Sequence, residues 1–150
     1  MATHELITRI EIAAPVERVW SILADFTQYP RWNPFIRSVS GIARRGERLR
    51  VSIQPKGRRA MTFRPRVLGA ADGQELRWLG SLGFRGLFGG EHYFLLENLG
   101  AGHTRFTQGE KFSGLLVGYF VSQMEKQTQA GFEAMNRALK DRAESGMSQR

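Results

Sequence analysis

The 150-residue sequence contains no cysteine. This absence excludes disulfide bonds, metal sites built from thiolates and a cysteine nucleophile, and it leaves the redox compartment open. The sequence also lacks any run close to the roughly 20 apolar residues that a membrane-spanning helix needs, and its first residues lack the basic and then apolar pattern of a secretory leader. We therefore expect a soluble, untargeted protein, with the cytoplasm as the default location.

Histidines are also few, and their spacing argues against a metal site. His4 is terminal, His103 stands in a glycine-rich turn, and no H-x-x-x-H or H-x-E pattern occurs. No serine has the G-x-S-x-G setting of a hydrolase nucleophile. The glycine-rich segment 80–90 joins two strand-like runs and opens no helix, so it is not expected to cradle a phosphate. We expect neither a metal nor a cofactor.

Acidic residues are outnumbered, with 14 Asp and Glu against 22 Lys and Arg and a formal net charge of +8. Many of the arginines lie in the middle of the chain, where Arg48 and Arg50 alternate with Leu49 and Val51. This alternation predicts a solvated basic face on strands rather than a specific nucleic-acid site. Weak contact with an anionic membrane or an acidic protein stays open.

The first 34 residues predict a strand and then two short helices. Leu6, Ile10 and Ile12 favour a strand over about 5–13. Pro15 suits the first position of a helix over about 15–24, because its missing N–H has no partner there. One apolar stripe marks the buried side of this helix: Val16, Val19, Trp20 and Leu23. A second helical turn follows near 27–31 and ends at the prolines.

From residue 35 to about 112 the pattern predicts an antiparallel meander, with strands separated by turn signals near 41–46, 54–58, 69–73, 80–90 and 98–102. Pro65 interrupts the longest run, which indicates an edge strand or a bulge. After Gly114 the period changes to 3.6 and predicts a helix over about 115–143. A sheet and a helix that each bury one face give a two-layer α+β domain, single over 1–150, with its core at about 5–143.

Three motifs resemble the START-like superfamily, also called SRPBCC, which includes polyketide cyclase/dehydrase and lipid-transport domains: Ala13-Ala-Pro-Val-Glu-Arg-Val-Trp20, Tyr29-Pro-Arg-Trp-Asn-Pro-Phe35 and Glu110-Lys-Phe-Ser-Gly-Leu-Leu116. The similarity runs from about Glu5 to Arg142. It implies a helix-grip fold of the Bet v 1 type, a curved seven-stranded antiparallel sheet around a long C-terminal helix. The superfamily contains carriers, cyclases and co-chaperone-like modules, so the resemblance implies a fold more narrowly than a function.

Strand periodicity places three polar side chains among apolar ones on the inward faces of two strands. His92 shares a face with Phe94 and Leu96, and Gln108 and Glu110 share a face with Phe106 and Phe112. A buried carboxylate needs partners. His92 and Glu110 therefore either anchor a ligand in an apolar pocket, or form an acid/base pair, or are satisfied core groups.

We expect a cavity between sheet and helix that binds a small hydrophobic ligand, such as a lipid, a polyketide or an isoprenoid-like molecule, for transport, sequestration or sensing. The expected ligand-binding residues are Trp32, Trp78, His92, Phe94, Phe106, Gln108, Glu110, Phe120 and Met124. The loop residues Leu82, Phe84, Leu87 and Phe88 either gate the cavity, dip into a membrane surface or fold back on the core. In an aromatase/cyclase, His92 and Glu110 would be catalytic; in an interaction module, the basic exterior would meet an acidic partner. The oligomeric state is left open.

Overall fold

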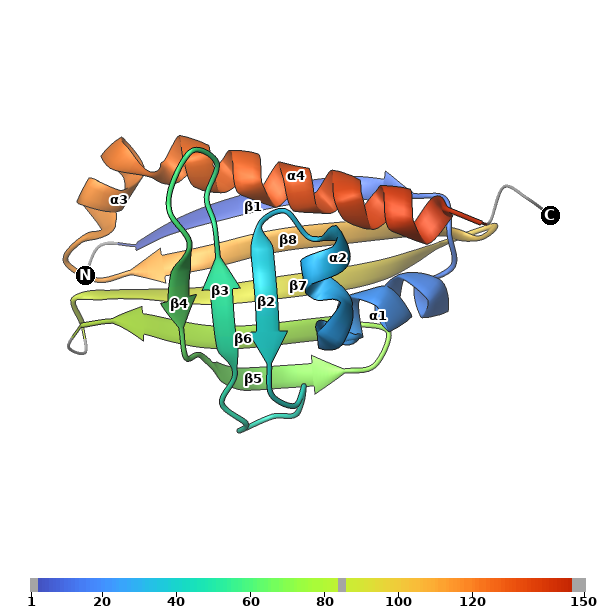
Figure 1. Ribbon diagram of the computed structural model, residues 1–150, viewed down its shortest axis with the longest axis horizontal. Helices are drawn as coiled ribbons and strands as arrows, with labels where there is room; N and C mark the ends of the chain where they lie inside the picture. The colour runs from blue at the N-terminus through green and yellow to red at the C-terminus, as the bar shows by residue number, and fades with distance from the viewer. Residues whose placement is uncertain (1–2, 84–85, 147–150) are drawn as a thin grey trace.

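In the computed structural model, residues 3–83 and 86–146 are described, and they form two antiparallel sheets with helices at the start and the end of the chain (Figure 1). The elements in chain order are β1 (Thr3–Ile12), α1 (Val16–Ala24), the 3₁₀ turn η1 (Phe26–Gln28), α2 (Tyr29–Trp32), β2 (Ile36–Ser40), β3 (Arg50–Ile53), β4 (Met61–Phe63), β5 (Arg66–Ala71), β6 (Glu75–Leu82), β7 (Phe88–Gly100), β8 (His103–Ser113), α3 (Val117–Gln123) and α4 (Glu125–Glu144).

The larger sheet has five strands in the order β1-β8-β7-β6-β5, and the smaller has three in the order β2-β3-β4. The strands of the smaller sheet run across those of the larger one (Figure 1). The helix-grip class is confirmed, but the described residues contain eight strands where seven were expected. The reason lies at Pro65, which lacks the N–H that a continuous ladder needs. It separates β4 from β5 and sends them to different sheets.

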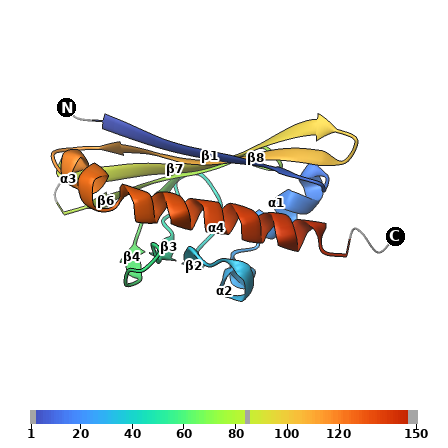
Figure 2. The same ribbon diagram turned by 90° about the horizontal axis from the view of Figure 1, so that it is seen from above.

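Helix α4 packs on β1 and β8, while the smaller sheet covers the β5–β6 side of the same face (Figures 1 and 2). The single helix expected over 115–143 is divided at Met124, whose φ of −129° and ψ of −12° leave the helical range. The bend lets Phe120 of α3 pack on Phe112, with ring centroids 4.1 Å apart, while Phe132 of α4 packs on Phe35 at 5.3 Å.

The first helix begins one residue later than its sequence predicts. Pro15 is extended, with φ −69° and ψ 157°, and its carbonyl accepts the amide protons of Arg18 and Val19. It therefore precedes the helix rather than opening it. Further on, the side-chain oxygen of Asn33 accepts hydrogen bonds from the amides of Phe35 and Ile36 at 2.9 and 2.8 Å. This Asx turn directs the chain from α2 into β2.

The inward-facing side chains of β7 and β8 form part of the core, as their alternation in the sequence predicts. His92, Phe94 and Leu96 on β7 are buried, and so are Phe106 and Gln108 on β8. These side chains point at α4 and the smaller sheet, whereas the alternate positions face outward. The larger sheet thus presents one mainly apolar face, and that face holds the polar residues considered below.

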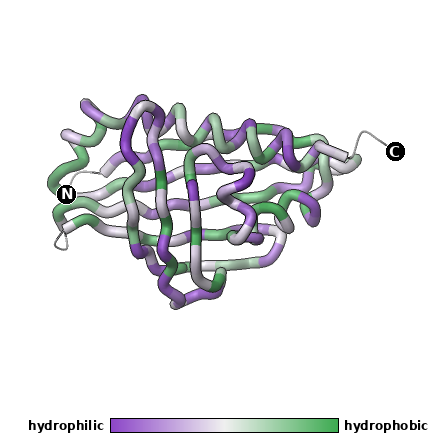
Figure 3. The backbone as a smooth tube through the Cα atoms, viewed as in Figure 1, coloured by the Kyte–Doolittle hydropathy of each residue, from purple (hydrophilic) through white to green (hydrophobic). Residues whose placement is uncertain are grey.

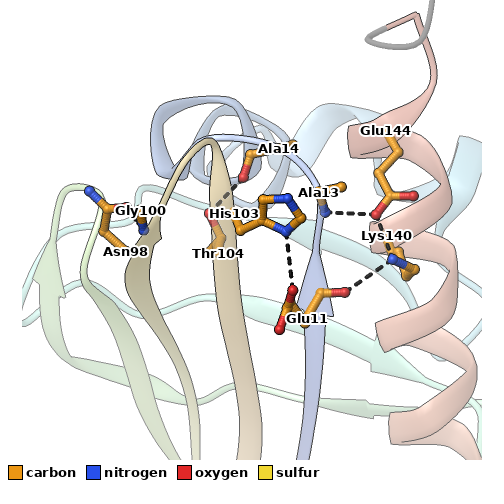
Figure 4. A network of polar contacts seen from close by, with 9 residues as sticks. All are labelled: Glu11, Ala13, Ala14, Asn98, Gly100, His103, Thr104, Lys140 and Glu144. Atoms are coloured by element: carbon orange, nitrogen blue, oxygen red, sulfur yellow. Dashed lines mark hydrogen bonds and ion pairs between the residues drawn. The ribbon is translucent and has the colours of Figure 1, made fainter.

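At the end of α4 a polar network fixes the helix to β1 (Figure 4). Glu144 accepts hydrogen bonds from Lys140 Nζ at 2.5 Å and from the Ala13 amide at 2.7 Å. These two bonds lower the pKa of the Glu144 carboxyl, the Lys140 bond most. Lys140 also donates to the Glu11 carbonyl at 3.1 Å. The carboxylate therefore ties the last turn of the helix to the end of the first strand.

We expect Glu144→Gln to lower the free energy of unfolding by about 0.5 kcal/mol near pH 7, because the side chain is partly exposed and solvent screens the ion pair. A carboxyl whose pKa is lowered by folding stabilises above its ordinary pKa of about 4.3, and this contribution is lost as the pH falls through the folded value. Urea unfolding at pH 7 and pH 3.5 measures it. The difference from wild type should shrink at the lower pH, while Glu133→Gln on the exposed side of α4 should change little at either.

Candidate functional site

A cavity of about 140 Å³ lies between the larger sheet, the smaller sheet and the α3–α4 bend. Trp78 and Phe112 contribute from the larger sheet, Val51 and Phe63 from the smaller, and Phe120 from α3. Ser81 and Leu82 at its edge are exposed, and Met61 and Met124 are half-buried, so the cavity reaches the surface between the β3–β4 turn, the end of β6 and α3. The walls are chiefly apolar.

Five of the nine residues expected to bind ligand line this cavity: Trp78, His92, Glu110, Phe120 and Met124. The other four lie elsewhere. Phe94 and Phe106 are fully buried and stack on each other, with centroids 5.8 Å apart, further along the sheet. Trp32 packs against Tyr29 on α2 at 5.2 Å. Gln108 lies behind His92, so it reaches the cavity only through that residue.

Of the four loop residues, Leu82 and Phe88 line the cavity, whereas Leu87 is half-buried and outside the lining. Phe84 lies outside the described residues. The lining also includes residues that were not predicted: Ile53, Pro55, Met61 and Phe63. Their alternation with polar residues showed an inward face, but it did not show that β3 and β4 form a second sheet that crosses the first.

One polar pair faces the cavity. His92 Nδ1 lies 3.1 Å from Glu110 Oε1, and His92 Nε2 lies 2.9 Å from Gln108 Oε1. The imidazole is nearly buried, stacked on Trp78 with centroids 5.4 Å apart and enclosed edge-on by Phe94 and Phe132. The aromatic rings fix the plane of His92, and the hydrogen bonds fix its rotation within that plane.

A chain of hydrogen bonds continues from the pair into the core. Gln108 Nε2 donates to Asn136 Oδ1 at 2.8 Å, and Asn136 Nδ2 donates to Thr8 Oγ1 at 2.8 Å. Thr8 Oγ1 in turn donates to the backbone carbonyl of Gln108 at 2.9 Å. The chain joins β7, β8, α4 and β1. Each of these three side chains is buried, so every bond replaces one that water would otherwise make.

The direction of this chain is set at its far end. The backbone carbonyl of Gln108 can only accept a hydrogen bond, so the Thr8 hydroxyl donates to it. Thr8 Oγ1 then accepts from the side-chain amide of Asn136. Asn136 Oδ1 in turn accepts from the side-chain amide of Gln108. Gln108 therefore presents its oxygen to His92, and His92 Nε2 must carry a proton. A hydrogen bond between His92 Nδ1 and the Glu110 carboxyl needs a further proton, on one group or the other.

Gly90 gives the Glu110 carboxyl its place. Gly90 and His92 are inward-facing neighbours on β7, and Glu110 lies opposite His92 on β8. A methyl group built on Gly90 would overlap Glu110 Oε2. The side-chain exposure of Glu110 is 18%, so this carboxyl keeps an open side toward the cavity. The arrangement can accept or donate a hydrogen bond to a bound molecule at that open side.

The outer face of the same strands shows a purely structural arrangement. Tyr93 lies across Gly109 and donates to Glu5 at 2.6 Å, and Arg77 stacks over its ring at 4.6 Å. Burial, followed by the Glu5 bond, raises the pKa of Tyr93, which stays a neutral donor. The Tyr93 hydroxyl and the Arg77 guanidinium thus have partners within the protein.

The described residues form neither a metal site nor a membrane-spanning helix. Between residues 3 and 146, leaving aside 84–85, no three His, Asp or Glu side chains gather closely enough to hold a metal ion. The helices in that part of the chain are too short or too polar for any of them to span a bilayer.

An antiparallel sheet that grips a C-terminal helix around a cavity is the helix-grip architecture of START-type proteins. Residues 3–144 match the family described as polyketide cyclase / dehydrase and lipid transport. The chain belongs to this family. A comparison with curated proteins found no match.

Solved structures agree on the fold. The chain is 27% identical to a START superfamily protein from Mycobacterium smegmatis, covering 95% of this chain and 98% of that one, with a TM-score of 0.74. It is 16% identical to the Zhui aromatase/cyclase from Streptomyces sp. R1128, covering 97% and 96%, with a TM-score of 0.75. A norcoclaurine synthase from Thalictrum flavum is 13% identical, covering 97% of each chain, with a TM-score of 0.73.

Proposed function

We propose that this protein binds a compact, mainly apolar molecule in the cavity and orients it by one hydrogen bond to the His92–Glu110 pair, for transport, sequestration or sensing. The observation that carries the proposal is the open side of the Glu110 carboxyl in an otherwise apolar cavity. Apolar burial, at about 25 cal/mol per Å², supplies most of the affinity, and the polar pair selects the ligand and its orientation.

The volume of the cavity favours a small ligand or a compact end of a larger one. A cavity of about 140 Å³ is close to the roughly 150 Å³ that accommodates a benzene molecule in an engineered protein core. It is below the range of about 300–1,000 Å³ of drug-sized pockets. One aromatic ring matches this space, and a second fused ring or a longer chain would extend into the mouth past Met61 and Met124.

A second candidate is a cyclase of the aromatase type, in which the same pair moves a proton on a poly-β-keto chain. Two observations support the cyclase. The hydrogen bond between His92 Nδ1 and Glu110 requires a proton, and the structurally similar protein from Streptomyces is named an aromatase/cyclase. In that case His92→Ala would abolish turnover. In a carrier the same substitution would change ligand orientation and affinity, with no reaction to lose.

The proposal is tested with two probes that differ by one hydroxyl group, 2-naphthol and naphthalene, titrated while the fluorescence of the protein's tryptophans, including Trp78, is recorded. We expect wild type to bind 2-naphthol about tenfold more tightly, because a hydrogen bond contributes about 0.5–1.5 kcal/mol net and about 1.4 kcal/mol corresponds to a factor of ten. Glu110→Leu should remove the preference while keeping naphthalene binding. Gly90→Ala should weaken the preference by displacing the carboxyl.

Glu97→Gln provides the matched control, because Glu97 lies on β7 with Gly90 and His92 but is exposed and outside the cavity lining. It should bind both probes as wild type does. Native mass spectrometry of gently purified protein adds a test without chosen probes, through any small molecule that the protein retains. Equal affinity for both probes, or no saturable binding of either, would contradict the proposed function.

A further inference from the structure

The net positive charge of this protein comes from one part of the fold. Residues 37–66, from β2 to the start of β5, carry ten Arg and Lys side chains and a single acid, Glu47. The rest of the chain has twelve basic and thirteen acidic residues, so it is nearly neutral. All ten basic residues of the segment are exposed. The smaller sheet therefore has a positive outer surface, while the larger sheet does not.

Three of these cations lie at the cavity mouth. Lys56, Arg58 and Arg59 occupy the β3–β4 turn, which contacts the α3–α4 bend: Arg58 donates to the Gln123 carbonyl at 2.9 Å, and the Lys56 amide to the Gln127 carbonyl at 3.4 Å. In Figure 1 this turn lies over the first turns of α4, toward the end of the molecule where α3 lies. Cavity mouth and basic turn thus share one surface.

The same end carries exposed apolar side chains. Leu115 is 75% exposed and Tyr119 64%, and Leu116 and Val121 beside them are also exposed. The amides of Leu115 and Leu116 bond to the carbonyls of Gly86 and Leu87, which holds the start of α3 against the β6–β7 turn. In Figure 3 the hydrophobic colour where β8 runs into α3 lies near the hydrophilic colour of the β3–β4 turn. We call this surface, formed by residues 56–59 and 115–121, the mouth surface.

Projecting apolar side chains beside a cluster of cations match the two layers of a lipid surface. Leucine and tyrosine enter the boundary between headgroups and acyl chains, and Lys and Arg meet anionic headgroups. Nucleic acid would use the cations but would leave Leu115 and Leu116 in water. An acidic protein would need a shaped apolar partner for α3, whereas a bilayer adapts to it.

We propose that the mouth surface docks on bilayers that contain anionic phospholipid, which places the cavity opening at the boundary of the hydrocarbon layer. This inference goes beyond the proposed function, because docking requires no ligand in the cavity. Where both hold, a mainly apolar ligand would pass between bilayer and cavity without crossing bulk water.

The test is sedimentation of the purified full chain with sucrose-loaded vesicles of phosphatidylcholine, alone or with 30% phosphatidylglycerol. We expect binding to the anionic vesicles only. Arg58→Glu/Arg59→Glu should reduce the partition coefficient about tenfold or more. Arg44→Glu/Arg45→Glu makes the same charge change in the β2–β3 turn, at the opposite end of the smaller sheet, and should reduce it far less.

A second pair of variants tests the apolar component. Leu115→Ser/Tyr119→Ser should reduce binding several-fold at 0.5 M salt, where charge attraction is screened, whereas Ile42→Ser, an exposed apolar residue of the β2–β3 turn, should not. Circular dichroism checks that each variant is folded. Equal losses from the two arginine pairs, or binding to heparin or oligonucleotide with none to vesicles, would overturn the proposal. Naphthol binding in the cavity is measured separately, so either proposal can fail alone.

Discussion

Gly131→Val is expected to lower the free energy of unfolding by about 3 kcal/mol, an effect large enough to leave much of the protein unfolded under mild stress. Gly131 is buried on α4, and a Cβ at this position would overlap Cδ1 of Phe35. Phe35 cannot easily move, because it is 1% exposed and its ring packs edge-on against Phe132. The glycine therefore allows α4 to approach the start of β2 closely.

Gly131→Ala separates steric cost from helix propensity. Alanine favours a helix over glycine by about 1 kcal/mol, whereas crowding a packed core costs about 1–3 kcal/mol, so we expect a net loss of about 0–2 kcal/mol. The control is Gly118→Ala on α3, where a Cβ meets no atom within 4 Å. That variant should be as stable as wild type or slightly more stable. Urea unfolding of the three variants gives the order, and a Gly131→Ala protein more stable than wild type would contradict the packing argument.

Much of this fold follows from local patterns. Period-2 alternation identified the buried faces of β3, β7 and β8, and the 3.6 period identified the C-terminal helical region. Both signals come from burial of one face, which the sequence records residue by residue. The bend at Met124 left no such record, since neither proline nor glycine marks it and the hydrophobic positions continue on both sides.

The site was predicted in part for the same reason. The alternation of side chains along the strands placed His92, Gln108 and Glu110 on inward faces. It could not distinguish a side chain that lines a cavity from one that packs against another layer. That difference separates Trp78, which lines the cavity, from Phe94, which does not. It depends on how the smaller sheet crosses the larger one. Asn136 and Thr8, more than 100 residues apart, gave no signal at all, because only the packing of α4 on β1 joins them.

The buried hydrogen-bond chain leads to the second large expected effect. Gln108→Leu should lower the free energy of unfolding by about 3 kcal/mol, because it leaves two buried groups unpaired, the His92 Nε2 proton and Asn136 Oδ1, at about 1–3 kcal/mol each. The apolar character of leucine offsets part of this cost. Asn136→Leu should cost less, since Gln108 keeps its bonds to His92 and, at 3.4 Å, to the Phe132 carbonyl.

The double variant Gln108→Leu/Asn136→Leu should be more stable than the sum of the single losses predicts by about 1 kcal/mol, because removing both partners leaves fewer unpaired atoms than removing Gln108 alone.

Nitrogen NMR of His92 adds a readout that stability does not provide. In wild type the Nε2 proton should exchange slowly with solvent, since Gln108 accepts it in the core. In Gln108→Leu it should exchange rapidly in molecules that remain folded, and the preference for 2-naphthol over naphthalene should fall, because the ring no longer holds Glu110 in one orientation. Strict additivity together with an unchanged His92 spectrum would show that the chain does not hold the imidazole, and the carboxyl would then depend on Gly90 alone for its position.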